Sequence, residues 1–173
     1  MSFPLMPVMG FIVPTAGIAY LSNGSSVVIP SGVYTTTYSN WGKSGGGGGG
    51  TAAYTGGRGG YSQYRSGTLG VAPGGTISGS GGTGGAAGVN SASTASTVAG
   101  GAGTSMIFRY NGATISTSLG GGGGGRVTTT ANGVAGTDAA APITTLSGAG
   151  GRLNVSTPGT GYGGYALVQW ETY

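Results

Sequence analysis

Short stretches rich in β-branched and aromatic residues, separated by turn residues, recur along most of the chain. The clearest example is residues 33–41, where Val, Tyr, Thr and Trp predominate, and these residue types favour strands. Because side chains alternate between the two faces of a strand, Tyr38 and Trp41 are expected on opposite faces. Apolar residues nowhere recur with a sustained period of about 3.6, the spacing typical of a helix. The pattern therefore predicts an all-β fold with no α-helix.

Further strands follow from the same pattern, and turn residues connect them. Asn23-Gly24 and Asn111-Gly112 each lie between two apolar stretches, which is a strong signal for a β-hairpin. Turns that contain proline and glycine are expected at residues 30–32 and 72–75. Together these elements indicate a small β-sandwich-like domain with long glycine-rich loops. The further strands are predicted at residues 18–21, 27–29, 60–71, 76–78, 104–110, 113–119 and 165–170.

Two unbroken runs of six glycines, Gly45–Gly50 and Gly120–Gly125, each follow a predicted strand. Glycine costs about 0.5–1 kcal/mol more than alanine in an ordered structure, and these runs have no side chains to offset that cost. The runs are either flexible linkers or packed polyglycine II helices, which are extended, have about three residues per turn and bond to neighbouring backbones. Their position inside the β pattern favours packed helices. Gly47 and Gly122, within the runs, are therefore structural residues that a valine is expected to disrupt.

The segment at residues 1–21 is apolar but repeatedly interrupted. Pro4, Pro7 and Pro14 break it too often for a membrane-spanning helix, and it lacks the basic start of a secretory signal. Its apolar side chains favour an extended arm that packs on something else, and the alternative is a poorly ordered tail. We therefore divide the chain into an N-terminal attachment arm at residues 1–25 and a glycine-rich β domain at residues 26–173.

Charged residues are few, with six basic and two acidic among 173 residues. The basic residues are scattered singly and do not form the cluster of cations that nucleic-acid binding requires. Cysteine and histidine are absent, which removes disulfides, thiolate nucleophiles, imidazole bases and the usual zinc ligands. Asp138 and Glu171 are the only acids, and no phosphate-binding GK[ST] loop is present. The chain is therefore not expected to be an enzyme, to hold a cofactor or metal, to bind nucleic acid or to insert into a membrane.

Trp41 and Trp170 each lie at the end of a predicted strand. Large apolar residues are scarce in this chain, so both tryptophans are expected to be largely buried structural residues. Replacing a well-packed tryptophan by alanine costs about 3–5 kcal/mol.

Four landmarks follow one another between residues 26 and 170. Val28–Val33 is an apolar strand with a Pro-Ser-Gly turn, and the polar strand after it ends at Trp41-Gly42. Gly67–Ile77 contains a strand, a Pro-Gly turn and a strand, and Gly103–Phe108 opens a hairpin before the second glycine run. Gly164–Trp170 is an apolar closing strand that ends in tryptophan. In this order the landmarks resemble the glycine-rich domains of bacteriophage tail fibre and minor tail proteins, of which the apolar arm is not a part.

This resemblance implies a structural protein on the surface of a phage virion, a small tail-fibre or tail-tip component involved in host recognition. The alternative is a capsid decoration or head-fibre protein that grips the shell with its arm. An ice-binding protein would need sustained triplet spacing with Thr or Ala ladders, and an RNA-binding segment would need more than the one Arg-Gly-Gly at Arg58. The expected partners are other virion subunits through the arm, a host surface receptor, and further copies of the chain in a homo-oligomer.

Receptor contact is expected from aromatic side chains on loops, because tyrosine offers rigid amphipathic area at low entropic cost. The structural alternatives are that Tyr61 and Tyr64 only pack in the sheet and that Arg126 only confers solubility. The candidates lie around the first glycine run or follow the second: Tyr54, Arg58, Tyr61, Tyr64 and, as a weaker one, Arg126.

Overall fold

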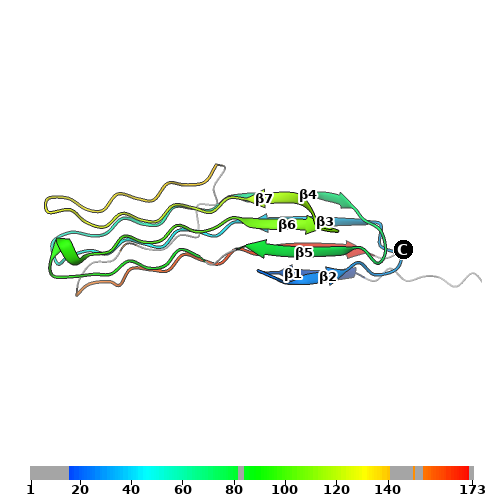
Figure 1. Ribbon diagram of the computed structural model, residues 1–173, viewed down its shortest axis with the longest axis horizontal. Coiled ribbons are helices and arrows are strands. Elements are labelled where there is room, and N and C mark those ends of the chain that lie inside the picture. Colours follow the sequence, from blue (N-terminus) through cyan, green and yellow to red (C-terminus); the bar gives the residue numbers. More distant parts are fainter. Residues whose placement is uncertain (1–15, 82–83, 141–149, 151–153, 172–173) are drawn as a thin grey trace, which may run out of the picture.

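The computed structural model describes residues 16–81, 84–140, 150 and 154–171. An antiparallel β-sandwich occupies one end of the elongated molecule, and its strands continue into a bundle of extended segments at the other end (Figure 1). The described residues contain one short helix, the 3-10 turn η1 at Thr94–Ser96, and no α-helix. The prediction of an all-β, sandwich-like fold is confirmed.

Two four-stranded sheets form the sandwich. The first has the strand order β1-β8-β3-β4 and the second the order β2-β5-β6-β7, and neighbouring strands are antiparallel. Each strand overlaps one of the predicted strands, because local β-propensity and turn residues suffice to locate them. The strands are β1 (Ala16–Leu21), β2 (Ser26–Val28), β3 (Thr35–Trp41), β4 (Tyr64–Gly70), β5 (Thr76–Gly81), β6 (Met106–Tyr110), β7 (Ala113–Ser118) and β8 (Ala166–Glu171).

The even-numbered residues of β3 face the core. Tyr38 stacks on Phe108 of the opposite sheet, with ring centroids 4.7 Å apart. Asn40 is fully buried, its Nδ2 donates to the carbonyl of Met106 at 3.1 Å, and its own carbonyl accepts from Ser118 Oγ at 2.8 Å. These bonds join the two sheets at the end of the core nearest the bundle. The buried core consists of Leu21, Ile29, Val33, Val71, Ile77, Met106, Phe108, Ala166 and Val168.

Asn111 and Gly112 form the tight turn of the β6–β7 hairpin. Their φ angles are 47° and 81°, and a type I′ hairpin turn requires positive φ at both positions. The two strands pair from Tyr110 opposite Ala113 to Met106 opposite Ser118. This hairpin prediction is confirmed.

The hairpin predicted through Asn23-Gly24 is wrong. A turn does form there, with the amide of Ser25 donating to the carbonyl of Ser22 at 3.2 Å. However, β1 pairs with β8 in the first sheet and β2 pairs with β5 in the second. The turn bonds to β5, since the amide of Gly24 donates to Gly79 at 3.0 Å and the amide of Gly79 donates to Ser25 at 2.9 Å. The chain therefore crosses from one sheet to the other at this turn.

The position of β1 shows that the domain begins earlier in the chain than the predicted boundary at residue 25. Residues 16–21 pair with β8 along their whole length, and Leu21 belongs to the core. A boundary at residue 25 is therefore too late, because part of the apolar segment is needed as an edge strand of the first sheet. The rest of the predicted arm, residues 1–15, lies outside the described residues.

Both tryptophans are partly buried. Trp41 lies on the outer face of the first sheet, opposite to Tyr38, and its ring packs between Tyr64 at 5.0 Å and Tyr165 at 4.6 Å. Trp170 packs against the margin of the core, and its indole covers Gly17. Core burial therefore holds in part for Trp170 but not for Trp41, because strand alternation places Trp41 on the outer side of the sheet.

The bundle continues the strands of the sandwich as extended segments that run side by side along the molecule (Figure 1). Turns at the far end join segment I to II, III to IV, and V to VI. Within the described residues the segments are I (42–51), II (55–63), III (84–90), IV (97–105), V (119–127), VI (132–140) and VII (157–164).

Segment I, which contains the first glycine run, lies at the centre of the bundle, and every one of its residues is buried. Its successive amides donate to three neighbouring segments in turn, so that every third residue bonds to the same neighbour. This period of about three residues is that of a polyglycine II helix, and no glycine of the run has a positive φ. The donors are Gly42, Gly45 and Gly48 to segment II (2.9, 3.0 and 2.8 Å), Lys43, Gly46 and Gly49 to segment IV (3.1, 2.9 and 2.8 Å), and Ser44 and Gly47 to segment VII (3.2 and 2.8 Å).

The two glycines singled out in the runs are both part of this packing. Gly47 is buried, its amide donates to segment VII, and its carbonyl accepts from Gly88 of segment III at 2.8 Å. A Cβ on Gly122 would lie 2.9 Å from the amide nitrogen of Thr137, closer than Cβ atoms approach in real structures. The runs are therefore packed helices and not linkers.

Segments that have neighbours on more sides contain more glycine. Segment V, which bonds to both I and VI, has glycine at all positions from 120 to 125. The outer segment VI has glycine only at Gly133 and Gly136, three residues apart, where a Cβ would overlap the carbonyls of Gly125 and Gly122. Three residues per turn place every third residue on the same side of the helix. Glycine is therefore needed only on the sides that touch a neighbour.

This packing predicts opposite effects of alanine at two glycines. At Gly48 a Cβ would overlap the carbonyl of Gly125, whereas at Gly70 it meets nothing within 4 Å. Gly48→Ala should lower the free energy of unfolding by about 1–3 kcal/mol or prevent folding, as overpacking does. Gly70→Ala, the matched control, should be neutral or stabilising by about 0.4–1 kcal/mol. Thermal denaturation followed by circular dichroism measures both, and equal stability of the two variants would contradict the packing.

Candidate functional site

The five candidate contact residues lie in three places. Tyr54 is in the turn between segments I and II, and Arg126 is near the far end of segment V. Arg58 and Tyr61 lie within segment II, and Tyr64 is the first residue of β4. Of these, the structure brings only Arg58 and Tyr61 into direct contact.

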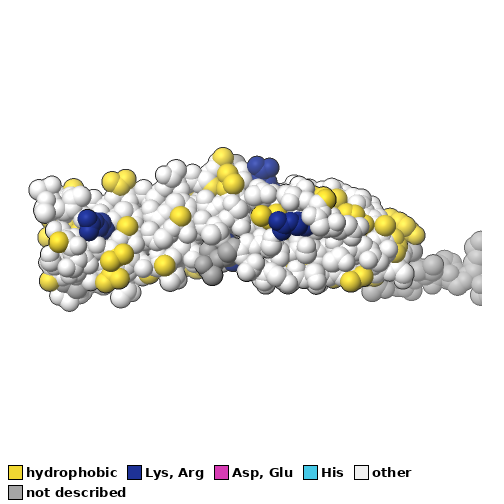
Figure 2. Space-filling view, viewed as in Figure 1, with side chains coloured by type: hydrophobic (Ala, Val, Ile, Leu, Met, Phe, Trp, Pro, Cys, Tyr) yellow, Lys and Arg dark blue, Asp and Glu magenta, His cyan; other side chains and the backbone are white. Residues whose placement is uncertain are grey.

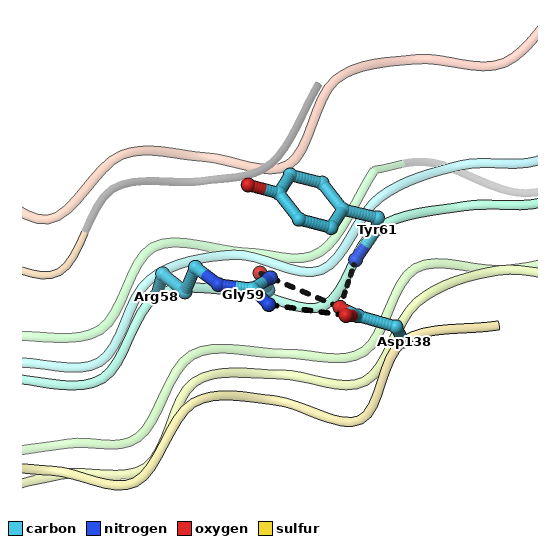
Figure 3. A network of polar contacts seen from close by, with 4 residues as sticks. All are labelled: Arg58, Gly59, Tyr61 and Asp138. Carbon is cyan, nitrogen blue, oxygen red and sulfur yellow. Dashed lines mark hydrogen bonds and ion pairs between the residues drawn. The ribbon is translucent and has the colours of Figure 1, made fainter. Parts of the chain in front are cut away.

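Arg58, Tyr61 and Asp138 form a cluster between segments II and VI (Figure 3). The guanidinium of Arg58 donates from Nη1 and Nη2 to the two carboxylate oxygens of Asp138, at 2.9 and 3.1 Å. The amide of Tyr61 donates to the same carboxylate at 2.9 Å, and the Arg58 guanidinium lies 4.1 Å from the centre of the Tyr61 ring. Arg58 also donates to the carbonyl of Gly59 at 3.0 Å. Both predicted contact residues are thus held by partners within the chain.

The cluster shifts the pKa of both charged groups. The hydrogen bond from Arg58, followed by the bond from the Tyr61 amide, lowers the pKa of Asp138 below its usual value. The bond to Asp138 raises the pKa of Arg58. The two side chains are 36% and 35% exposed, so water screens the pair and its contribution to stability is small. The geometry of this ion pair suits a structural link between two segments.

Tyr64 belongs to a row of aromatic rings on the outer face of the first sheet. Tyr20, Tyr165, Trp41 and Tyr64 follow one another with centroids 6.1, 4.6 and 5.0 Å apart. The hydroxyls of Tyr64 and Ser39 lie 3.0 Å apart, and this bond, ahead of one with Ser66, lowers the pKa of Tyr64. Tyr64 thus packs on the sheet, and its side chain remains accessible.

The far end of the bundle carries the turns between segments, and we call it the tip. It contains the turn at residues 51–55, the loop at 91–96 with η1, the turn at 128–131, and residues 154–156 before segment VII (Figure 1). The turns have their own internal bonds, such as Thr51 amide to Tyr54 carbonyl at 2.9 Å and Thr128 amide to Ala131 carbonyl at 3.1 Å. The tip is therefore built of short, defined loops.

Side chains tie these loops to one another. Asn90 accepts the amide of Gly50 at 2.8 Å and donates to the carbonyl of Ser156 at 2.7 Å. Asn132 accepts the amide of Thr55 at 2.8 Å, so it links the first and third turns. At the ends of the segments, where glycine no longer recurs every third residue, each asparagine side chain bonds to backbone groups of neighbouring loops.

Arg126 performs the same function on the second loop. Its Nη1 donates to the carbonyls of Ala95 and Thr97 at 3.3 and 3.4 Å. It therefore fixes the loop that contains η1 against segment V, in addition to any effect on solubility. These cross-links connect the loops of the tip to one another and to segment V.

The tip surface is nearly uncharged. Among its described residues Arg126 is the one charged side chain, and the others are mainly Ser, Thr, Ala and Asn. Val155 is 72% exposed there. Figure 2 shows the same scarcity over the whole face in view, where a few Lys and Arg side chains lie among uncharged polar, backbone and hydrophobic surface. Such a surface can recognise a partner by shape and hydrogen bonding, with little electrostatic steering.

Several residues of this site were not among the sequence candidates. Asn90, Asn132 and Val155 interrupt stretches of small residues, and each lies where a segment ends or a loop begins. An interruption of the three-residue glycine pattern is therefore the signal that could have located them.

The described residues contain no group of three or more His, Cys, Asp or Glu side chains that could hold a metal ion. No helix in this part of the chain is long and apolar enough to cross a membrane. No protein-family model matches the chain, and no curated protein matches its sequence.

The Arg58 cluster predicts a pH-dependent contribution to stability. Because the pKa of Asp138 is lowered on folding, the contribution is present above the unfolded pKa, about 3.9, and is lost as the pH falls through the folded value. Asp138→Asn should lower the free energy of unfolding at neutral pH by about 0.2–1 kcal/mol, the range for an exposed pair.

Chemical denaturation at neutral pH and in acid, where Asp138 is protonated, measures this difference. Asn keeps the shape of the side chain and can still accept the Tyr61 amide, so it serves as a matched replacement. A stability difference of the same size at both pH values would contradict an ionic role.

Proposed function

We propose that the protein is a structural component of a bacteriophage virion, a small tail-fibre or tail-tip protein that takes part in host recognition. In this proposal the tip contacts the host receptor and the opposite end attaches to the particle. The observation that carries the proposal is the hydrogen-bonded bundle, which holds several cross-linked loops at its far end. Loops that are positioned by a rigid scaffold are a common way to build a binding surface.

The course of the first strand supports the division into two ends. Ala16 pairs with Glu171 and Leu21 pairs with Ala166, which lies next to segment VII. The chain therefore enters the described structure at the end of the sandwich that is remote from the bundle. An arm formed by residues 1–15 would attach there, and it would bind other virion subunits or further copies of the chain.

The composition of the molecule also supports a scaffold role. Segments I and V consist mainly of glycine, and their backbone amides and carbonyls bond to neighbouring segments. Such a bundle offers length and stiffness with few reactive groups. Of the predicted contact residues, Tyr54 and Arg126 remain with the tip, and Arg58, Tyr61 and Tyr64 support the scaffold.

A charge introduced at the tip should reduce adsorption of the particle to its host. Val155 in the tip and Val134 on the side of segment VI are 72% and 78% exposed, so Val155→Asp and Val134→Asp form a matched pair. Val155→Asp should slow adsorption about tenfold or more, which corresponds to roughly 1.4 kcal/mol of lost binding. Val134→Asp should leave it unchanged. The adsorption rate of particles that carry each variant at normal copy number is the measurement.

Equal adsorption of both variants would contradict receptor contact by the tip. Immunogold labelling of the same particles separates the two locations, since label on the capsid shell would favour a decoration or head-fibre protein instead.

The arm should be required for incorporation but not for folding. Deleting residues 2–14 leaves β1 intact and should therefore yield a folded, soluble protein, as measured by circular dichroism. The truncated protein should be missing from purified particles, as measured by quantitative mass spectrometry. Incorporation at the copy number of the full chain would refute the attachment role.

A further inference from the structure

The outer face of the first sheet is exposed and nearly uncharged. Side chains alternate along each strand, so the odd-numbered residues of β3 and the residues in register with them lie on this face. Glu171 is the one charged residue among its described members, and the others are apolar or uncharged and polar. The face consists of Ala16, Ile18 and Tyr20 at β1, Tyr165, Leu167, Gln169 and Glu171 at β8, Thr35, Thr37, Ser39 and Trp41 at β3, and Tyr64, Ser66, Thr68 and Gly70 at β4.

Aromatic rings give this face an exposed apolar row. Tyr20 is 66% exposed, and Tyr64 and Tyr165 are 39% and 38% exposed. Trp41 lies between Tyr165 and Tyr64, with ring centroids 4.6 and 5.0 Å away, so the rings cover much of one another's faces. Little free ring face is left on which a sugar or a base could stack. An exposed apolar patch marks a protein interface, and interfaces between identical chains are the more apolar kind.

The order of the rings suits a second copy of the chain. In the first sheet β1 and β4 are the two edges, and β8 and β3 lie between them. A two-fold axis parallel to the strands lays β1 of one copy over β4 of the other, and β8 over β3. Tyr20 then faces Tyr64 of the second copy, Tyr165 faces Trp41 of the second copy, and each pair occurs twice, as in any isologous contact. Aromatic pairs of this kind stabilise an interface beyond the area that they bury.

The other two-fold axis that would pack this face on itself runs across the strands, and it matches the surfaces less well. It would place Trp41 opposite Thr35 and Tyr64 opposite Gly70, so the aromatic pairing would be lost. With the axis parallel to the strands, Glu171 lies opposite Thr35 and not opposite a second carboxylate. The distribution of apolar and charged residues therefore favours this axis.

The size of the face suits a specific but weak contact. Its four strands have six or seven residues each. With strands about 4.8 Å apart and a rise of about 3.3 Å per residue, the face measures roughly 19 by 20 Å. Covering it on two copies buries on the order of 1,000 Å² of accessible surface, which is the lower limit for a specific interface. The dissociation constant should therefore lie in the micromolar range.

We propose that two copies of the chain associate through this face, around a two-fold axis parallel to the strands. Because the bundle continues the strands (Figure 1), this axis places both tips at one end of the dimer and both copies of Ala16 at the other. The arrangement is compatible with attachment at one end and recognition at the other. It assigns a surface to the contact between copies, and it does not depend on receptor contact by the tip.

Sedimentation velocity of the purified full chain, at concentrations from below to well above the micromolar range, measures the association. The dimer fraction should rise with concentration. Tyr20→Glu and Tyr64→Glu should each weaken the association about tenfold or more, because each places a carboxylate against a ring of the second copy. Val28→Glu is the matched control, since Val28 is 60% exposed on β2 of the second sheet. It should leave the association unchanged, and circular dichroism should show that all variants are folded.

Mixtures of variants test the two-fold axis itself. In a mixture of Tyr20→Glu with Tyr64→Lys, the introduced carboxylate faces the introduced ammonium across the interface, and the second Tyr20–Tyr64 pair stays intact. This mixture should form a heterodimer, whereas Tyr20→Glu mixed with Tyr64→Glu should not, because two carboxylates would then face each other. High salt should weaken the first heterodimer.

Four results would overturn the proposal. One is a folded full chain that remains monomeric up to its limit of solubility. Another is a loss of association in Val28→Glu equal to that in Tyr20→Glu. The third is equal behaviour of the two mixtures, which would exclude this axis. The fourth is association that is lost on deletion of residues 2–14 but kept in Tyr20→Glu, since the N-terminal segment would then form the contact. Val155→Asp should associate like the unmodified chain, so failure of receptor contact by the tip and failure of this contact are seen separately.

Discussion

Direct hydrogen bonding between the backbones of neighbouring polyglycine II helices is the interaction on which the rest of this structure depends. The amides of segment I bond to segments II, IV and VII, and its carbonyls accept from segments III and V. A net backbone hydrogen bond contributes about 0.5–1.5 kcal/mol, which is similar in size to the entropic cost of a glycine. The bundle can therefore be stable without a hydrophobic core, but only if nearly every buried amide is satisfied.

This requirement explains how the two ends of the molecule fit together. A β-strand and a polyglycine II helix are both extended, so a strand such as β3 can continue into segment I without a turn. The sandwich holds the strands in register through its apolar core and through the bonds of Asn40 between the sheets. At the other end, Asn90, Asn132 and Arg126 close the bundle by bonding to backbone atoms of neighbouring loops. The glycines in the interior of the bundle leave no room for larger side chains.

Much of the fold was predictable because it depends on local signals. Strand positions, the Asn111-Gly112 hairpin and the packing of the glycine runs all follow from residue type and spacing. The pairing of β1 with β8 could not be predicted in this way. An edge strand can pair with any strand of matching pattern, and β8 lies at the other end of the chain. The same holds for Arg58 and Asp138, which are 80 residues apart in sequence. The scarcity of large apolar residues predicts burial of Trp41, but strand alternation places it on the face opposite to Tyr38.

The candidate site was predictable only in part. Tyr54 and Arg126 could be associated with the ends of the glycine runs, but the convergence of several loops at one tip requires knowledge of how the segments pack. With the structure known, the three-residue period of glycine indicates how the segments pack. Glycine marks the side of a segment that touches a neighbour, and residues that interrupt the period mark the loops.

Amide hydrogen exchange of Gly45–Gly50, measured by NMR at single-residue resolution, tests the central claim most directly. If these amides are bonded to neighbouring segments in the interior of the bundle, they should exchange as slowly as those of the β6–β7 hairpin. Exchange at the rate of an unstructured chain, with the β-strands still protected, would show that the glycine run is a flexible linker and would contradict this account.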